Sequence, residues 1–185
     1  MTKQYETYQV EVGEVTRNLR LFEVKPGLRI AILNILGDTP LVQAASSELA
    51  QRLQGIEYTA LVTAASKSIP LVYQLSVDTG KPYVVLRKEY KTYMGDAIKA
   101  ETESITTGTL QTLYLDEKDF DLVKGQRVIL VDDVISTGST LKAMRQLIEK
   151  AGGGVAAEAA IFTEGDPDDW QHIIALGHLP VWVDE

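Results

Sequence analysis

The feature that most constrains the fold is a run of apolar residues that ends in two adjacent carboxylates. Val128 to Val131 are all apolar, and Asp132 and Asp133 follow directly. Such runs are typical of parallel strands that are buried on both faces. A Thr-Gly-Ser-Thr run then leads into residues 141–148, whose apolar positions recur at helical spacing. The segment therefore predicts a strand, an acidic tip, a loop of small residues and the start of a helix.

This arrangement predicts a site for a ribose 5-phosphate. The loop residues are Ser136, Thr137, Gly138, Ser139 and Thr140. Their backbone N–H groups and the positive end of the helix dipole would point at one place, which suits a phosphate. Asp132 and Asp133 would lie at the strand's carboxyl end, where open α/β sheets bind ligands, and could accept hydrogen bonds from two neighbouring hydroxyls. The plainer alternative is an N-capped helix after a strand, with both carboxylates solvated.

The rest of the chain alternates predicted strands and helices. Residues 8–24 are mixed and suit short strands. Further strands are predicted at 28–36, 58–64, 82–86, 155–162 and 181–183, with a hairpin whose arms are 103–106 and 110–115 around Thr107-Gly108-Thr109. Helices are predicted from 38 to about 53, from 70 to before 80, after the loop, and at 170–176. This order predicts an α/β fold with a doubly wound, mostly parallel sheet, in one domain over residues 1–185.

Composition is that of an ordinary globular protein, with 45% hydrophobic and 24% charged residues. The net charge of −8 argues against broad binding to nucleic acid or to an anionic membrane. There is no cysteine, so thiol chemistry and cysteine metal sites are excluded. The first 19 residues lack an apolar signal core, and no apolar run reaches membrane-spanning length. We therefore expect a cytoplasmic protein.

The segment from Val128 to Thr140 closely resembles the signature of the type I phosphoribosyltransferases, which bind phosphoribosyl pyrophosphate (PRPP). The resemblance implies that fold, with a small hood within about residues 1–40 over the base. It implies that Asp132 and Asp133 hold the ribose hydroxyls and that residues 136–140 hold the 5-phosphate. It also implies Mg²⁺ on the oxygens of PRPP, without direct side-chain ligands, and a homodimer.

Two further segments resemble the pyrophosphate site of this family. The residues are Ala65, Ser66, Lys67 and Ser68 in one, and Arg87, Lys88 and Lys91 in the other. Each follows a predicted strand, where small residues or cations suit a polyphosphate. The alternatives are an ordinary strand-to-helix turn and a solvated charged loop. The resemblance implies that Arg87 is a third catalytic residue beside the acid pair. It also implies that residues 90–100 form a mobile lid, with Gly95 as a flexible point. The acidic residues Glu164, Asp166, Asp168 and Asp169 are expected to be solvated.

The resemblance implies transfer of the phosphoribosyl group to a purine base in purine salvage, with adenine ahead of xanthine. Ser136 replaces the Asp that the hypoxanthine-guanine branch has before Thr-Gly. The adenine branch usually has Ser-Leu-Glu-Tyr-Gly where this chain has residues 104–108, Ser-Ile-Thr-Thr-Gly. One alternative is an orotate phosphoribosyltransferase, although residues 88–100 lack a His. Another is a non-catalytic PRPP sensor. A DNA-binding regulator is disfavoured, because the chain is acidic and only some 27 residues precede the first confident strand.

Overall fold

A five-stranded parallel sheet forms the centre of the protein, in a computed structural model that describes residues 5–103 and 110–183. The strands lie in the order β10-β9-β8-β4-β5. Their bounds are β4 Ala60–Ala64, β5 Tyr83–Leu86, β8 Arg127–Ile135, β9 Gly154–Glu164 and β10 Ile174–Leu179. The α/β class with a mostly parallel sheet is therefore confirmed.

Helices cover both faces of this central sheet. Helices α1 (Thr39–Arg52) and α2 (Ile69–Thr79) pack with Ile129 and Val131 of β8 in one apolar cluster. Helices α3 (Phe120–Val123) and α4 (Ser139–Lys150) pack with Val128 and Leu130 in another. Alternate residues of one buried strand thus serve opposite faces, which is why its sequence is continuously apolar.

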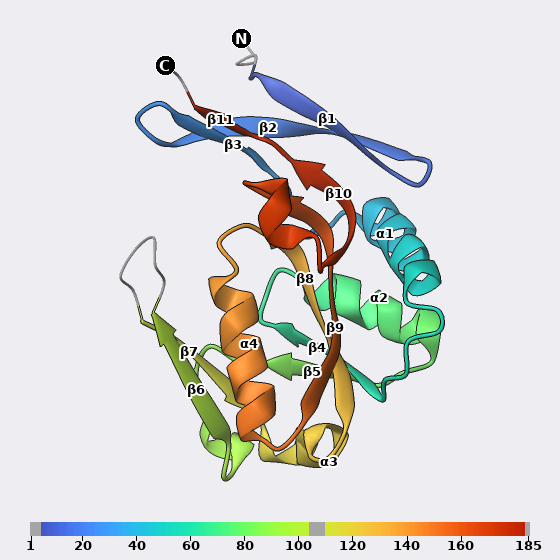
Figure 1. Ribbon diagram of the computed structural model, residues 1–185, viewed down its shortest axis with the longest axis vertical. Helices are drawn as coiled ribbons and strands as arrows, with labels where there is room; N and C mark the ends of the chain where they lie inside the picture. Colours follow the sequence, from blue (N-terminus) through green and yellow to red (C-terminus); the bar gives the residue numbers. More distant parts are fainter. Residues whose placement is uncertain (1–4, 104–109, 184–185) are drawn as a thin grey trace.

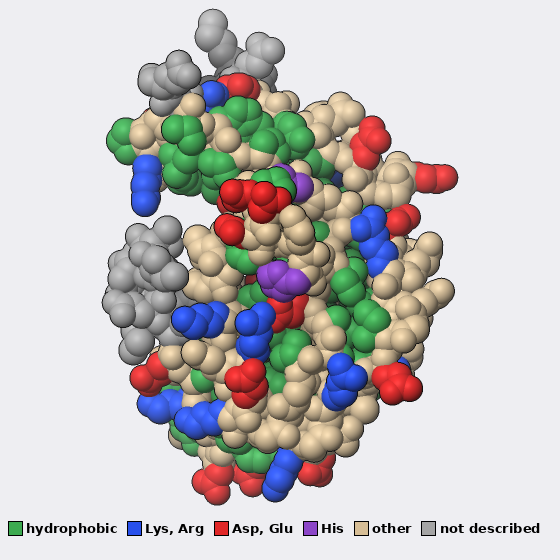
Figure 2. All heavy atoms as spheres, viewed as in Figure 1, with side chains coloured by type: hydrophobic (Ala, Val, Ile, Leu, Met, Phe, Trp, Pro, Cys, Tyr) green, Lys and Arg blue, Asp and Glu red, His purple; other side chains and the backbone are tan. Residues whose placement is uncertain are grey.

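A second, antiparallel sheet lies above the carboxyl ends of the central strands (Figure 1). We call it the hood. Its strands are β1 Thr7–Val12, β2 Val15–Lys25, β3 Leu28–Ile32 and β11 Val181–Val183. One face packs on α1 through buried Val10, Leu19 and Ala31. The opposite face keeps apolar side chains at the surface, including Phe22 and Ile32, and Figure 2 shows such side chains gathered on the hood.

A two-stranded hairpin packs beside α4. Its strands are β6 Ile98–Glu103 and β7 Leu110–Leu115, and the predicted turn at residues 107–109 lies outside the described residues. Ala100, Leu113 and Leu115 join the apolar cluster of α4. Three short 3₁₀ segments complete the described chain, η1 Thr92–Met94, η2 Glu117–Asp119 and η3 Pro167–Trp170.

One predicted strand was too long, and one predicted helix was wrong. The strand predicted at residues 28–36 ends at Ile32, although Leu33 and Ile35 are buried. These residues are apolar because they pack beneath the hood, and Asn34 accepts a local hydrogen bond from the Leu36 N–H at 3.2 Å instead of joining a sheet. The helix predicted at residues 170–176 is instead the end of η3 followed by β10, whose short apolar run pairs with β9.

Candidate active site

The two predicted carboxylates lie together in the last residues of β8. The strand runs past Asp132 and Asp133 to Ile135, so the pair is within the strand rather than beyond it. The Ser68 hydroxyl, at the start of α2, lies 2.6 Å from Asp132 Oδ1 and accepts the Asp133 N–H at 3.1 Å. Lys67 Nζ lies 3.0 Å from Asp133 Oδ2. The turn after β4, which includes a cis peptide bond between Ala65 and Ser66, is therefore tied directly to the acid pair.

Burial and repulsion between the two carboxylates favour the protonated form of Asp132. Burial first, and the charge of Asp133 second, raise the pKa of Asp132 from 3.8 to about 7. The Ser68 hydroxyl acts in the opposite direction, because it hydrogen bonds to the charged form. A ligand whose hydroxyls donate to Asp132 would favour the carboxylate form in the same way.

The loop after β8, where the sequence predicted a phosphate site, lines a small pocket. A pocket of about 50 Å³ is lined by Asp132 and residues 134–141. Helix α4 begins directly after Gly138, whose φ of 70° is in the left-handed region. The Trp170 ring packs on this glycine so closely that a Cβ would come within 2.9 Å of it. The N-terminus of α4 therefore lies at the pocket. Trp170, which comes from a distant segment of the chain, holds the loop in place.

The cations predicted for pyrophosphate lie at neighbouring strand ends but differ in their surroundings. Arg87 and Lys88 are exposed at the end of β5, and neither has an ion pair with a residue that the structure describes. The backbone of Arg87 exchanges hydrogen bonds of 2.9 and 2.8 Å with Tyr114 of β7. Lys91 is instead paired with Glu89 at 2.9 Å. Lys67 contacts the acid pair, so these four cations do not form one cluster.

The predicted lid at residues 90–100 is more structured than expected. Residues 98–100 belong to β6, and Met94 is only 1% exposed. The Asp96 N–H donates to Glu117 at 2.9 Å, and a Cβ on Gly95 would collide with the same carboxylate. One apolar side chain thus anchors part of the segment, and its mobility as a lid stays a prediction.

One predicted surface residue is buried. Glu164, at the end of β9, is 8% exposed, whereas Asp166, Asp168 and Asp169 are exposed as expected. The sequence could not reveal this difference, because all four residues belong to one short acidic segment. The burial of Glu164 arises from strands β8 and β10 on either side of β9.

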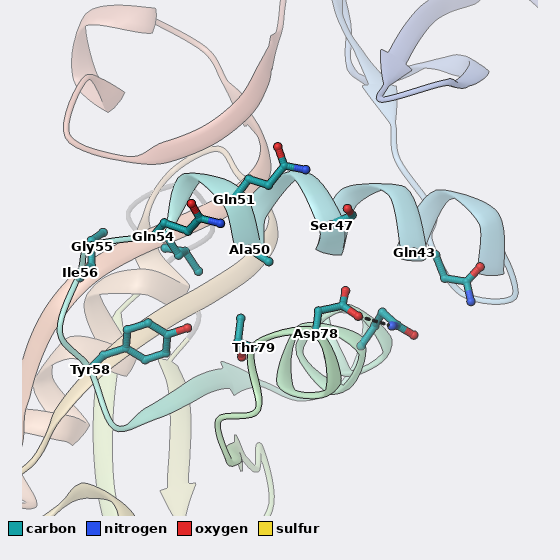
Figure 3. A pocket seen from close by; sticks show the side chains of 12 residues that line it. Gln43, Ser47, Ala50, Gln51, Gln54, Gly55, Ile56, Tyr58, Asp78 and Thr79 are labelled. Carbon is teal, nitrogen blue, oxygen red and sulfur yellow. Dashed lines mark hydrogen bonds between the residues drawn. The ribbon is translucent and has the colours of Figure 1, made fainter.

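A further cavity lies away from these strand ends. It measures about 590 Å³ and lies between α1 and α2, with Tyr58 at its edge before β4 (Figure 3). Its one carboxylate, Asp78, is already hydrogen bonded to Ser46 and Gln74 at 2.5 and 2.8 Å. The cavity has no cation for a phosphate. It is separate from the acid pair and the phosphate loop.

These features define a phosphoribosyltransferase-like α/β protein, with an acid pair, a phosphate loop and a hood. A family model described as "Phosphoribosyl transferase domain" matches residues 33–172, and the chain belongs to this family. An adenine phosphoribosyltransferase of Agathobacter rectalis is 31% identical over 125 residues, which cover 67% of this chain and 68% of that protein. A hypoxanthine/guanine phosphoribosyltransferase of Methanocaldococcus vulcanius is 36% identical over 106 residues, 57% of this chain and 54% of that protein.

A regulatory protein is also similar. The purine biosynthesis transcriptional repressor PurR of Bacillus subtilis is 26% identical over 161 residues, 84% of this chain and 56% of the repressor. The chain thus spans little more than half the length of the first curated relatives it matches. Among solved structures, adenine phosphoribosyltransferase from Thermoanaerobacter pseudethanolicus superposes with a TM-score of 0.70 at 22% identity, covering 86% of this chain and 95% of that one. This likeness establishes the fold.

No helix in the described part of the chain is long and apolar enough to cross a membrane.

Proposed function

We propose that the protein transfers the 5-phosphoribosyl group of PRPP to a purine base and releases pyrophosphate. The observation that carries the proposal is the acid pair of β8 directly beside the open phosphate loop. Asp132 and Asp133 would accept the ribose hydroxyls, and the N–H groups of residues 136–140 would bind the 5-phosphate. This places C1 of the ribose over the carboxyl edge of the central sheet, beneath the hood.

In this reaction the protein would act mainly by positioning the substrates and neutralising charge, rather than by covalent catalysis. As the bond from C1 to the pyrophosphate oxygen breaks, positive charge develops on the ribose and negative charge on the leaving group. Arg87 and Lys88 would bind the leaving pyrophosphate, with Lys67, Ser68 and the backbone at Ala65 and Ser66 on its other side. Lys91 would join them only after leaving Glu89. The base nitrogen then bonds to C1, and the imidazole ring of the purine gives up its N–H proton to water or to the departing pyrophosphate.

We propose Mg²⁺ as the cofactor, carried on PRPP oxygens. Among residues 5–103 and 110–183, no three His, Cys, Asp or Glu side chains come close enough to hold a metal ion together. We expect its ligands to be oxygens of the substrate, where Mg²⁺ would neutralise the leaving group. Chelation of Mg²⁺ should abolish pyrophosphate release. A rate that is unchanged in excess chelator would contradict this assignment.

For the base, we propose adenine first and xanthine second. The likeness to the Agathobacter rectalis enzyme supports adenine. The sequence at residues 104–108, which departs from the usual adenine pattern, lies outside the described residues. The deciding experiment incubates the protein with PRPP, Mg²⁺ and a panel of purine and pyrimidine bases and measures pyrophosphate release. Release with orotate alone would favour the orotate alternative.

The second candidate function is a PRPP-sensing regulatory domain. The match to the PurR repressor over 84% of the chain favours it. Calorimetric PRPP binding without pyrophosphate release for any base would select this candidate. Loss of that binding in a folded Asp132→Ala/Asp133→Ala double variant would support the ribose assignment in either case. Unchanged binding in that variant would overturn the assignment.

We further propose a homodimer. Helix α2 presents Tyr73 and Val77, about one helical turn apart, to solvent at 55% and 59% exposure, and such neighbouring apolar side chains suit a protein interface. Light scattering after size exclusion should give twice the mass of the chain. Val77→Asp should shift the protein towards the monomer, whereas the exposed Val183→Asp in the hood should not. A monomeric wild type would contradict this proposal.

A further inference from the structure

The order of the strand ends places the base on one side of the ribose. Along the carboxyl edge, β5 and β4 lead to the cations proposed for pyrophosphate, and β8 carries the acid pair. Displacement at C1 brings the entering nitrogen in opposite the leaving oxygen. With pyrophosphate over β4 and β5, the base must therefore approach from the side of β9. This strand end lies directly beneath the hood (Figure 1).

Glu164 is the carboxylate at that strand end. Ala160 pairs with Asp132 and Phe162 pairs with Val134, so Glu164, two residues further on, projects from the same face as Asp132. Its side chain is buried, with only 8% of the residue exposed. It has no hydrogen bond or ion pair with any residue in the described part of the chain. Its carboxylate oxygens are therefore free to accept a hydrogen bond from a ligand at this strand end.

The backbone on both sides of Glu164 is firmly held. Its carbonyl accepts the Trp170 Nε1–H at 2.8 Å. His178 lies 3.0 Å from the Thr163 hydroxyl and 3.1 Å from the Gly165 carbonyl oxygen, through its two ring nitrogens. Because these contacts use the backbone of Glu164 and groups on its neighbours, the carboxylate itself is left available. The position is thus fixed without using the charged group.

The electrostatic surroundings connect Glu164 to the acid pair. Burial raises the pKa of its carboxyl, and nearby Lys67 lowers it. Lys67 is the same residue that contacts Asp133. The other acids of the segment behave differently, since Asp166 and Asp168 are exposed and accept hydrogen bonds within the η3 turn. Among the four acids of this segment, Glu164 alone is buried.

We propose that Glu164 accepts a hydrogen bond from the imidazole N–H of the incoming purine and so orients the ring towards C1. Because adjacent strands are about 4.8 Å apart, the end of β9 lies only that far from the end of β8, over which the ribose is proposed to bind. The part of the purine above β9 is therefore the ring nearest the ribose. That ring carries an N–H in every unsubstituted purine. This inference rests on the proposed transferase function and deepens it by assigning a positioning residue for the base.

The test compares three variants with the wild type, whose active base is first identified with the panel above. Glu164→Leu keeps the size of the side chain but removes the acceptor, Glu164→Gln retains a neutral acceptor, and Asp169→Asn removes one charge from the exposed part of the same segment. Measurements are kcat/KM for the base at saturating PRPP, the Kd for PRPP, and Tm. Glu164→Leu should lower kcat/KM for the base about ten- to a hundredfold, as expected for a hydrogen bond to a charged acceptor.

Glu164→Gln should lose less activity, and Asp169→Asn should match the wild type. The Kd for PRPP should be unchanged in all three, and Glu164→Leu should melt no lower than the wild type because no internal partner is lost. A purely structural residue would instead lower Tm. Unchanged kcat/KM in Glu164→Leu, or a parallel loss of PRPP affinity, would overturn this inference while the proposed function stood. A wild type inactive with every purine would remove both.

Discussion

At the scale of single residues, the acid pair predicts an unusual dependence of stability on pH. The pKa of Asp132 is raised from 3.8 to about 7, so between these values the unfolded chain has lost a proton that the folded protein keeps. Stability from this residue therefore falls as the pH rises through that window and is level above it. Asp132→Asn should remove the decline, making the variant more stable relative to the wild type by about 1–3 kcal/mol at pH 8.

Denaturant unfolding of both proteins between pH 4.5 and pH 8 checks this, at roughly half-unit steps. Subtracting one curve of unfolding free energy against pH from the other cancels the contributions of the other ionisable groups and leaves that of Asp132. A difference that stays constant across the range would mean that Asp132 titrates normally. PRPP should reverse the effect, because its hydroxyls favour the carboxylate.

How much of the site could be predicted depended on distance along the chain. The acid pair and residues 136–140 are contiguous, so their roles were visible in one segment. Ser68 contacts Asp132 across 64 positions, and Trp170 reaches Gly138 from a different element. The burial of Glu164 similarly depends on its neighbouring strands. Such contacts are products of the tertiary fold, and no local pattern encodes them.

At the scale of elements, the start of α4 tests the phosphate loop. Gly138 and Gly125 share a φ of 70°, but only Gly138 faces another side chain, at 2.9 Å from the Trp170 ring. Each change to Ala should cost about 1 kcal/mol for the left-handed backbone. Gly138→Ala should in addition displace the loop and weaken binding of ribose 5-phosphate, measured by calorimetry, while Gly125→Ala should not. Equal affinities in the two variants would argue against a phosphate site here.

The contact between α4 and β9 rests partly on a buried charge. Glu158, which is 5% exposed, accepts the Arg145 Nε–H at 2.9 Å, and His172 is its next partner at 3.5 Å. Arg145→Ala should destabilise the protein by about 1–3 kcal/mol, because it leaves a buried carboxylate poorly paired. Thermal unfolding measures this, with Lys99→Ala at the exposed pair with Glu101 as a control expected to leave Tm unchanged. Similar losses in both variants would mean that burial is unimportant.

Element types were predictable where the sequence pattern was long. Helix α4 and the buried strand β8 follow from sustained helical periodicity and from a continuous apolar run. Ile173 to Leu176 is too short for either period to be decisive. Because this segment pairs with β9, it forms strand β10 instead of the predicted helix.

At the scale of the whole molecule, the central sheet and the hood have different proposed roles. The central sheet carries the acid pair, the phosphate loop and the cations at its strand ends, while the hood lies above them (Figure 1). The hood joins distant parts of the chain, because β11 pairs with β3. The alternation of strands and helices predicted the central sheet. It did not predict that the last strand would complete the hood, since an edge pairing leaves no pattern in so short a segment.

This division predicts that the hood can be weakened without losing PRPP. Ending the chain after Pro180 removes β11 together with the ring contact between Trp182 and Tyr8, whose centroids are 5.3 Å apart. Base transfer should fall sharply, because water would reach C1 as PRPP reacts, whereas the Kd for PRPP should change little. Trp182→Ala is the milder companion and should lie between this variant and the wild type in transfer. Calorimetry with PRPP and pyrophosphate release with the preferred base would be measured on both. A parallel loss of PRPP affinity would mean that the two sheets bind PRPP together, and that the central sheet alone does not form the PRPP site.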